Sequence, residues 1–117
     1  LDKEQYTDTL LNVILDEIDD IILLHDCEHR IVWMNRPGLN AFDVQLEDVM
    51  GRSCYTLFGR STCCEDCKST LNVGSKRRIT KTIPASGETY LCNSTPLITD
   101  GEVKLVVQHL TRTNPEK

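Results

Sequence analysis

The first clear pattern along the chain is a helical stripe of apolar residues within residues 1–18. Its members recur at steps of three and four, the spacing that gathers side chains on one face of an α-helix. They are Leu10, Leu11, Ile14, Leu15 and Ile18. Acidic and polar residues occupy the other face. The pattern predicts an amphipathic N-terminal helix, and two uses of its apolar face stay open: pairing with the same helix of a second copy, or covering the domain's own sheet.

Alternating positions and short apolar runs predict strands in the rest of the chain. Five segments have this character: 21–24, 30–34, 78–83, 89–97 and 103–110. The first two are separated by residues 26–29, a suitable length for a hairpin loop. The last three are joined by turns at Ser86-Gly87 and Asp100-Gly101, so they are expected to form an antiparallel meander.

Between the second and third strands the alternation stops. A Pro-Gly pair interrupts the chain, and apolar residues then follow at irregular helical spacings up to Gly51, which predicts short helices. Residues 54–58 indicate another helical turn. Residues 65–73 predict a longer helix, with Gly74 as its C-terminal cap.

This order of elements predicts an α+β domain: an open five-stranded antiparallel sheet with short helices on one face. A cavity between the sheet and the helices is the natural place for a ligand. We expect apolar residues of both layers to line it, namely Leu23, Val32, Phe42, Leu46, Leu57, Leu91 and Val107.

The two ends of the pattern resemble those of PAS domains. An apolar strand ending in Asp26, followed by a second strand and Asn35, is similar to the opening hairpin of that family. Residues 47–52 resemble its helical segment that ends in Gly and a basic residue. The last hairpin and its exit agree as well, although of the usual Asp-Ile-Thr exit only Thr111 is present. The resemblance covers about residues 10–112.

The resemblance implies a fold, a function and a domain layout. It implies a PAS-like sensory domain, commonly part of a two-component histidine kinase, that senses a small ligand or a redox or metal state and relays it through terminal helices. Residues 1–18 would be a dimer or signalling helix, 19–112 the PAS core, and 113–117 the start of a linker to an output kinase or regulator domain. The alternatives are a ligand-free module for dimerisation or protein interaction, and the sensory domain of a transcriptional regulator or diguanylate cyclase.

Cysteines are the residues whose spacing indicates chemistry. Four of the six lie between residues 54 and 67, and Cys54-Tyr55 with the later Cys-x-x-Cys ending at Cys67 resembles a subset of PAS domains. Zinc or an iron-sulfur cluster normally takes four ligands. Cys54, Cys64 and Cys67 would supply three. Candidates for the fourth are Cys63, Cys92, His25 and His29.

Two other uses of the cysteines stay open. In the first, Cys54 is a buried apolar residue, while Cys64 and Cys67 form a disulfide or remain thiols that join a loop to a helix. In the second, the thiols form a redox sensor.

Flavin and haem are not expected. Flavin-binding PAS domains have Asn before the reactive Cys and Arg after it, whereas Ser53 and Tyr55 flank Cys54 here. Haem would need an axial histidine in the helical stretch. The three histidines of the chain all lie outside it: His25, His29 and His109.

Composition narrows the function further. The chain has 117 residues, enough for one domain, and a net charge of -5 that argues against a nucleic-acid partner. No apolar run is long enough to span a bilayer, so no membrane contact is expected. No catalytic motif is present, so no enzymatic activity is expected. We expect a homodimer, a cytoplasmic location, and a longer parent protein that could itself be membrane-anchored.

Overall fold

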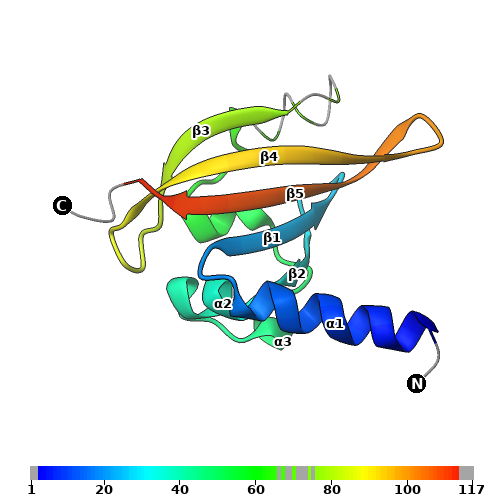
Figure 1. Ribbon diagram of the computed structural model, residues 1–117. Coiled ribbons are helices and arrows are strands. Elements are labelled where there is room, and N and C mark those ends of the chain that lie inside the picture. The colour runs from blue at the N-terminus through cyan, green and yellow to red at the C-terminus, as the bar shows by residue number, and fades with distance from the viewer. Residues whose placement is uncertain (1–2, 66, 68–69, 71–73, 75, 114–117) are drawn as a thin grey trace.

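The computed structural model describes residues 3–65, 67, 70, 74 and 76–113. Its elements in chain order are α1 (Lys3–Glu17), β1 (Ile21–Asp26), β2 (Ile31–Met34), α2 (Arg36–Phe42), α3 (Leu46–Val49), a 3₁₀ helix (Cys54–Phe58), β3 (Arg77–Thr82), β4 (Thr89–Thr99) and β5 (Glu102–Arg112). Figure 1 shows α1 apart from the sheet, with the short helices between β2 and β3 in the chain. No helix among the described residues is long and apolar enough to cross a membrane.

The five strands form one antiparallel sheet in the order β2-β1-β5-β4-β3. The α+β fold class and the five-stranded sheet predicted from the sequence are therefore confirmed. β4 and β5 run longer than predicted because they pair up to the tight turn at Asp100-Gly101. Of the predicted helix 65–73, the described residues Glu65, Cys67 and Thr70 are helical, and the others lie outside the described residues.

The hairpin between β1 and β2 closes without a glycine because of Asp26. Its carboxylate accepts hydrogen bonds from the backbone N–H groups of Glu28 and Arg30, both at 2.9 Å. His29 takes the left-handed conformation there, with φ of 65°. An Asp side chain that bonds the backbone just after it is a frequent way to form a turn.

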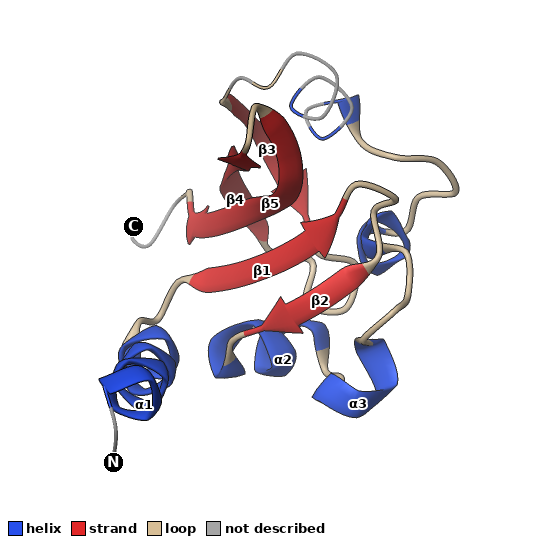
Figure 2. Ribbon diagram, turned by 90° about the vertical axis from the view of Figure 1, so that its right-hand side faces the viewer, coloured by secondary structure: helices blue, strands red, loops and turns tan. Residues whose placement is uncertain are grey.

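One face of the sheet is buried against the helices. The inward residues of its three central strands alternate along the chain: Ile21, Leu23 and His25 on β1, Tyr90, Cys92 and Ser94 on β4, and Val106, Gln108 and Leu110 on β5. The core also includes Phe42 of α2, Val49 of α3 and Leu57 of the 3₁₀ helix. Figure 2 shows α2 and α3 below β1 and β2, with α1 at the side of the domain next to α2.

Three residues expected to line the cavity lie elsewhere. Leu91 and Val107 alternate with buried neighbours and point to the opposite face of the sheet. Val32 is 38% exposed, next to the irregular pairing of β1 with β2. Because side chains alternate along a strand, a register choice that is wrong by one residue moves a side chain to the other face.

Candidate functional site

A group of polar and thiol side chains occupies the middle of the buried face. We call it the buried centre, and each of its members is at most 6% exposed. It consists of His25, Cys54, Cys67, Lys81, Cys92, Ser94 and Gln108. Four strands, the 3₁₀ helix and the helical residue Cys67 contribute to it. Burying so many polar groups is costly unless they bond to one another, so their contacts define what the site can do.

Gln108 of β5 connects the buried centre. Its Oε1 accepts hydrogen bonds from Lys81 Nζ at 2.9 Å and from Cys92 Sγ at 3.2 Å. Its amide nitrogen donates to His25 Nε2 at 2.9 Å and to the sulfur of Cys67. Lys81 can only donate a hydrogen bond, so the Gln108 oxygen faces Lys81 and the amide nitrogen faces His25.

This arrangement also fixes the tautomer of His25. Because Nε2 accepts from Gln108, the ring proton is on Nδ1, which donates to the carbonyl of Asp26 at 2.9 Å. Burial lowers the pKa of His25. The hydrogen bond to the Asp26 carbonyl opposes this change, while the charges of His29 and Lys81 act with burial. The ring is therefore held neutral, with a lone pair on Nε2.

We expect the stability of the metal-free domain to fall as the pH drops below about 6.5, the ordinary pKa of histidine. The folded state holds His25 with a lowered pKa, so the unfolded chain binds more protons in this range. One such group changes the free energy of unfolding by at most about 1.4 kcal/mol per pH unit. Burial also lowers the pKa of His29, although the charge of Asp26 opposes it, so this residue adds to the same trend. Urea unfolding between pH 5 and 7.5 measures the slope.

The variant His25→Gln provides the control for this slope. The free energy of unfolding of this variant should depend less on pH, whereas an equal slope in both proteins would exclude His25 as its source.

Asp26 acts in a different pH range. Burial raises its pKa, but hydrogen bonds from Arg30 and Glu28 lower it more, to below the ordinary value. Its contribution is therefore present above about pH 4 and is lost only at lower pH.

Three side chains of the buried centre could hold a metal ion. One ring nitrogen of His25 and the sulfurs of Cys54 and Cys67 lie within 4.8 Å of one another. The three residues come from β1, from the start of the 3₁₀ helix and from the helical residues after it. Thiolate and imidazole ligands together suit soft and borderline transition metals.

The other cysteines and histidines singled out from the sequence lie outside this triad. Cys64 is buried, Cys63 is half-buried, and Cys92 contacts Gln108 from β4. The ring of His29 lies 5.5 Å from that of His25. The structure contains no disulfide among the six cysteines, so the Cys64–Cys67 pair considered from the sequence is not formed in it.

Three residues of the buried centre were missed by sequence reasoning: Lys81, Ser94 and Gln108. Gln108 lies between the buried apolar residues Val106 and Leu110 on the inward face of β5. A polar residue at an inward position of a strand is the signal that could have found Gln108, had the inward face of β5 been known. No comparable signal indicates that Lys81 is buried, because the other residues of β3 are exposed and basic residues are common in this strand.

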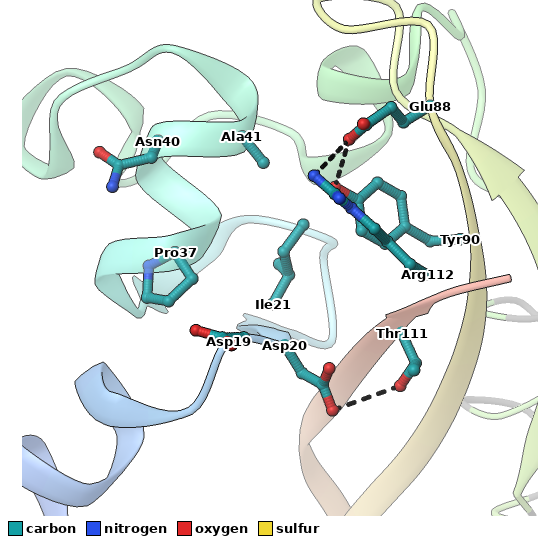
Figure 3. Close-up of a pocket in the computed structure, with 10 residues that line it drawn as sticks. All are labelled: Asp19, Asp20, Ile21, Pro37, Asn40, Ala41, Glu88, Tyr90, Thr111 and Arg112. Atoms are coloured by element: carbon teal, nitrogen blue, oxygen red, sulfur yellow. Dashed lines mark hydrogen bonds and ion pairs between the residues drawn. The ribbon is translucent and has the colours of Figure 1, made fainter. Parts of the chain in front are cut away.

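A surface pocket lies where the N-terminal helix leads into the sheet. It has a volume of about 610 Å³, and Figure 3 shows the side chains around it. They are Asp19, Asp20, Ile21, Pro37, Asn40, Ala41, Glu88, Tyr90, Thr111 and Arg112. None of the seven residues predicted to line a cavity is among them. Leu23, Phe42 and Leu57 are in the core, and Leu46 is half-buried beside it.

Polar contacts at this pocket tie the beginning of β1 to the end of β5. Asp20 contacts His109 Nε2 at 2.8 Å. It also accepts a hydrogen bond from Thr111 at 3.4 Å (Figure 3). Across the pocket, Arg112 and Glu88 form an ion pair at 3.0 Å. The segment that leads from α1 into β1 is therefore held to the end of the last strand.

The apolar stripe of α1 faces away from the sheet. Leu10, Leu11 and Ile14 are each 47–51% exposed, and Ile18 is 37% exposed. Leu15 is half-buried. Of the two uses expected for this stripe, covering the domain's own sheet does not occur in the structure.

Comparisons with known proteins agree on one family. A family model described as PAS domain matches residues 19–110. The PAS domain of an HTR-like protein from Haloarcula marismortui is 16% identical with a TM-score of 0.74, over 92% of this chain and 98% of that one. A sensory box sensor histidine kinase from Vibrio cholerae is 15% identical with a TM-score of 0.71, over 97% and 96%.

The LOV protein from Rhodobacter sphaeroides has a similar fold; it is 15% identical with a TM-score of 0.71, over 99% of this chain and 71% of that one. At such identities the likeness shows a shared fold alone. A comparison with curated proteins found no significant match.

Proposed function

Because this chain belongs to the PAS domain family, we propose that it is the sensory domain of a two-component histidine kinase. In this proposal the buried centre senses a small ligand or a redox or metal state. Residues 1–18 form the dimer and signalling helix, residues 19–112 the sensory core, and residues 113–117 begin the linker to the kinase. Small sensory domains of this kind act by shifting the balance between two arrangements of their ends.

One observation supports the proposal above all: β1 and β5 each carry a residue of the buried centre, and they are also the first and last strands in the chain. His25 and Gln108 face the centre from these adjacent strands and contact each other. The next residue along β5, His109, contacts Asp20, which lies between α1 and β1. A change around Gln108 therefore needs to move β5 only slightly to alter the contact that positions the N-terminal helix.

Gln108→Glu tests the relay in the full-length protein. A carboxylate keeps the acceptors for Lys81 and Cys92 but cannot donate to His25 or Cys67. We expect autophosphorylation with ATP to change several-fold, in either direction, while the domain stays folded. Gln45→Glu makes the same chemical change at an exposed position and should leave the rate as it is. Equal rates in all three proteins would contradict the proposal.

The exposed stripe of α1 supports a dimer as the unit that signals. Apolar side chains at three- and four-residue spacing on an uncovered helix face match the pattern by which two helices pair. A second copy of the same chain presents the same face, and twofold symmetry lets the two stripes cover each other. The stripe also serves the alternative function, that of a dimerisation module without a ligand.

Leu11→Glu is expected to convert the dimer to a monomer, because it places a charge within the apolar contact. The monomer should stay folded, since Leu11 is 51% exposed in the single domain. Thr9→Glu is the matched control, because two residues along a helix turn the side chain about 160° away from Leu11. Sedimentation equilibrium measures the mass. A monomeric wild-type chain, or a dimer that survives Leu11→Glu, would exclude this role of α1.

A further inference from the structure

The amide nitrogen of Gln108 lies between two atoms that can bind metal. It donates to His25 Nε2 and to Cys67 Sγ, so both lone pairs already converge on one positively polarised group. The sulfur of Cys54 belongs to the same cluster, within 4.8 Å of Cys67 Sγ and of one ring nitrogen of His25. All three side chains are at most 1% exposed. A cation at this position would have one nitrogen and two sulfur ligands.

We propose that His25, Cys54 and Cys67 bind a single cuprous ion, Cu⁺, in place of the Gln108 amide. This inference rests on the proposed function, since it names the state that the buried centre senses. The two thiols lose their protons to water when the ion binds, and the copper remains Cu⁺ throughout. No electron transfer is involved.

The number and type of ligands favour Cu⁺ over the other metals considered. Two thiolates and one imidazole form a soft, three-coordinate set, which suits Cu⁺. Structural zinc sites almost always have four protein ligands, and an iron-sulfur cluster is held by four cysteines or by two cysteines and two histidines. Here Cys92, another buried thiol, donates to Gln108 Oε1 from β4 and is not in the triad.

The charge near the triad agrees with a monovalent ion. Two thiolates and Cu⁺ together carry a charge of −1. The ammonium of Lys81, 3.9 Å from Cys67 Sγ, attracts this charge. Zn²⁺ would make the same ligand set neutral and remove that attraction, which is strong where water is excluded.

The surrounding contacts orient the histidine for this role. The Asp26 carbonyl holds the proton on Nδ1, so that Nε2 presents its lone pair toward the thiols. A hydrogen bond on the far side of a ligating ring is the usual way in which proteins fix its direction.

Binding of the ion also supplies the movement that a sensor needs. Cu⁺ would take the place of the Gln108 N–H group between His25 and Cys67, so Gln108 would have to turn away. Gln108 immediately precedes His109, which contacts Asp20 beside α1. Occupancy of the triad is thereby coupled to the junction of the signalling helix.

The test is an anaerobic titration of the reduced protein with Cu⁺ in competition with bicinchoninate. We expect one equivalent to bind, and the copper-edge X-ray absorption spectrum to show two sulfur neighbours and one nitrogen. Cys54→Ser and Cys67→Ser should each weaken binding by on the order of 100-fold or more. Cys27→Ser, at an exposed position, should bind as the wild type does. Circular dichroism checks that each variant is folded.

Three outcomes would overturn the inference: a spectrum with sulfur neighbours only, affinity unchanged in folded Cys54→Ser or Cys67→Ser, or Zn²⁺ that displaces one equivalent of Cu⁺. The spectrum of the wild-type protein decides the matter even if a variant does not fold. The kinase assay with Gln108→Glu uses no metal. Loss of Cu⁺ binding with an intact relay therefore overturns only this inference, and loss of the relay with intact Cu⁺ binding overturns only the proposed function.

Discussion

Replacing Gln108 by leucine is expected to lower the free energy of unfolding by about 3–5 kcal/mol, the cost of removing one partner of a buried charged group. The leucine removes the acceptor of Lys81 and Cys92 and the donor to His25 in one step. Each buried polar group that loses a hydrogen-bond partner adds about 1–3 kcal/mol. Guanidinium unfolding followed by circular dichroism measures the effect.

Two variants separate this effect from a simple change of side-chain type. Gln108→Glu keeps an acceptor for Lys81 and should lose less stability than Gln108→Leu. Gln45→Leu makes the leucine substitution at an exposed position, where changes usually stay within about 0.5 kcal/mol. If Gln108→Leu were as stable as the wild type, the contacts of the buried centre would contribute nothing to folding.

The order of elements was predictable because each has a strong local pattern. The period of the stripe from Leu10 to Ile18 requires a helix, and Asp100-Gly101 between two alternating runs requires a hairpin. Five antiparallel strands with helices on one face then follow from packing alone. Patterns of this kind depend only on neighbours in the chain, which the sequence displays directly.

Which side chains of β4 and β5 point toward the core was not predictable in the same way. Apolar side chains normally indicate the inward face, but in β5 the apolar Val107 points outward and the polar Gln108 inward. Likewise in β4 the outward residue is Leu91, while Cys92 and Ser94 face the core. An apolar outer face and a polar patch inside invert the usual signal. The strands in which polar side chains point inward and apolar ones outward are therefore the strands that contribute to the buried centre.

The metal triad was predictable only in part. The cysteine spacing drew attention to Cys54 and Cys67, and His25 was one of several candidates for a further ligand. Which candidates meet depends on the pairing of β1 with β5 and on where the chain returns after the 3₁₀ helix. Such contacts join residues far apart in the chain, and sequence spacing does not determine their distances.

Asn35 connects the three elements around the junction of α1. Its side chain is fully buried, and its oxygen accepts hydrogen bonds from the N–H groups of Ile22 at 3.0 Å and Gly38 at 3.1 Å. Its amide donates to the carbonyls of Leu15 at 2.9 Å and Asp20 at 3.0 Å. One side chain thus caps α2, pairs with β1 and fastens the end of α1.

Asn35→Leu is expected to destabilise the domain by on the order of 4 kcal/mol, because backbone groups of all three elements lose their partner at once. Asn35→Asp is the more selective change. It keeps the oxygen that caps α2 but turns a carboxylate toward the carbonyls of Leu15 and Asp20. Hydrogen exchange should therefore accelerate in α1 more than in the sheet. The exposed Asn40→Asp is the control, and equal exchange in α1 of all three proteins would show that Asn35 does not hold the signalling helix in place.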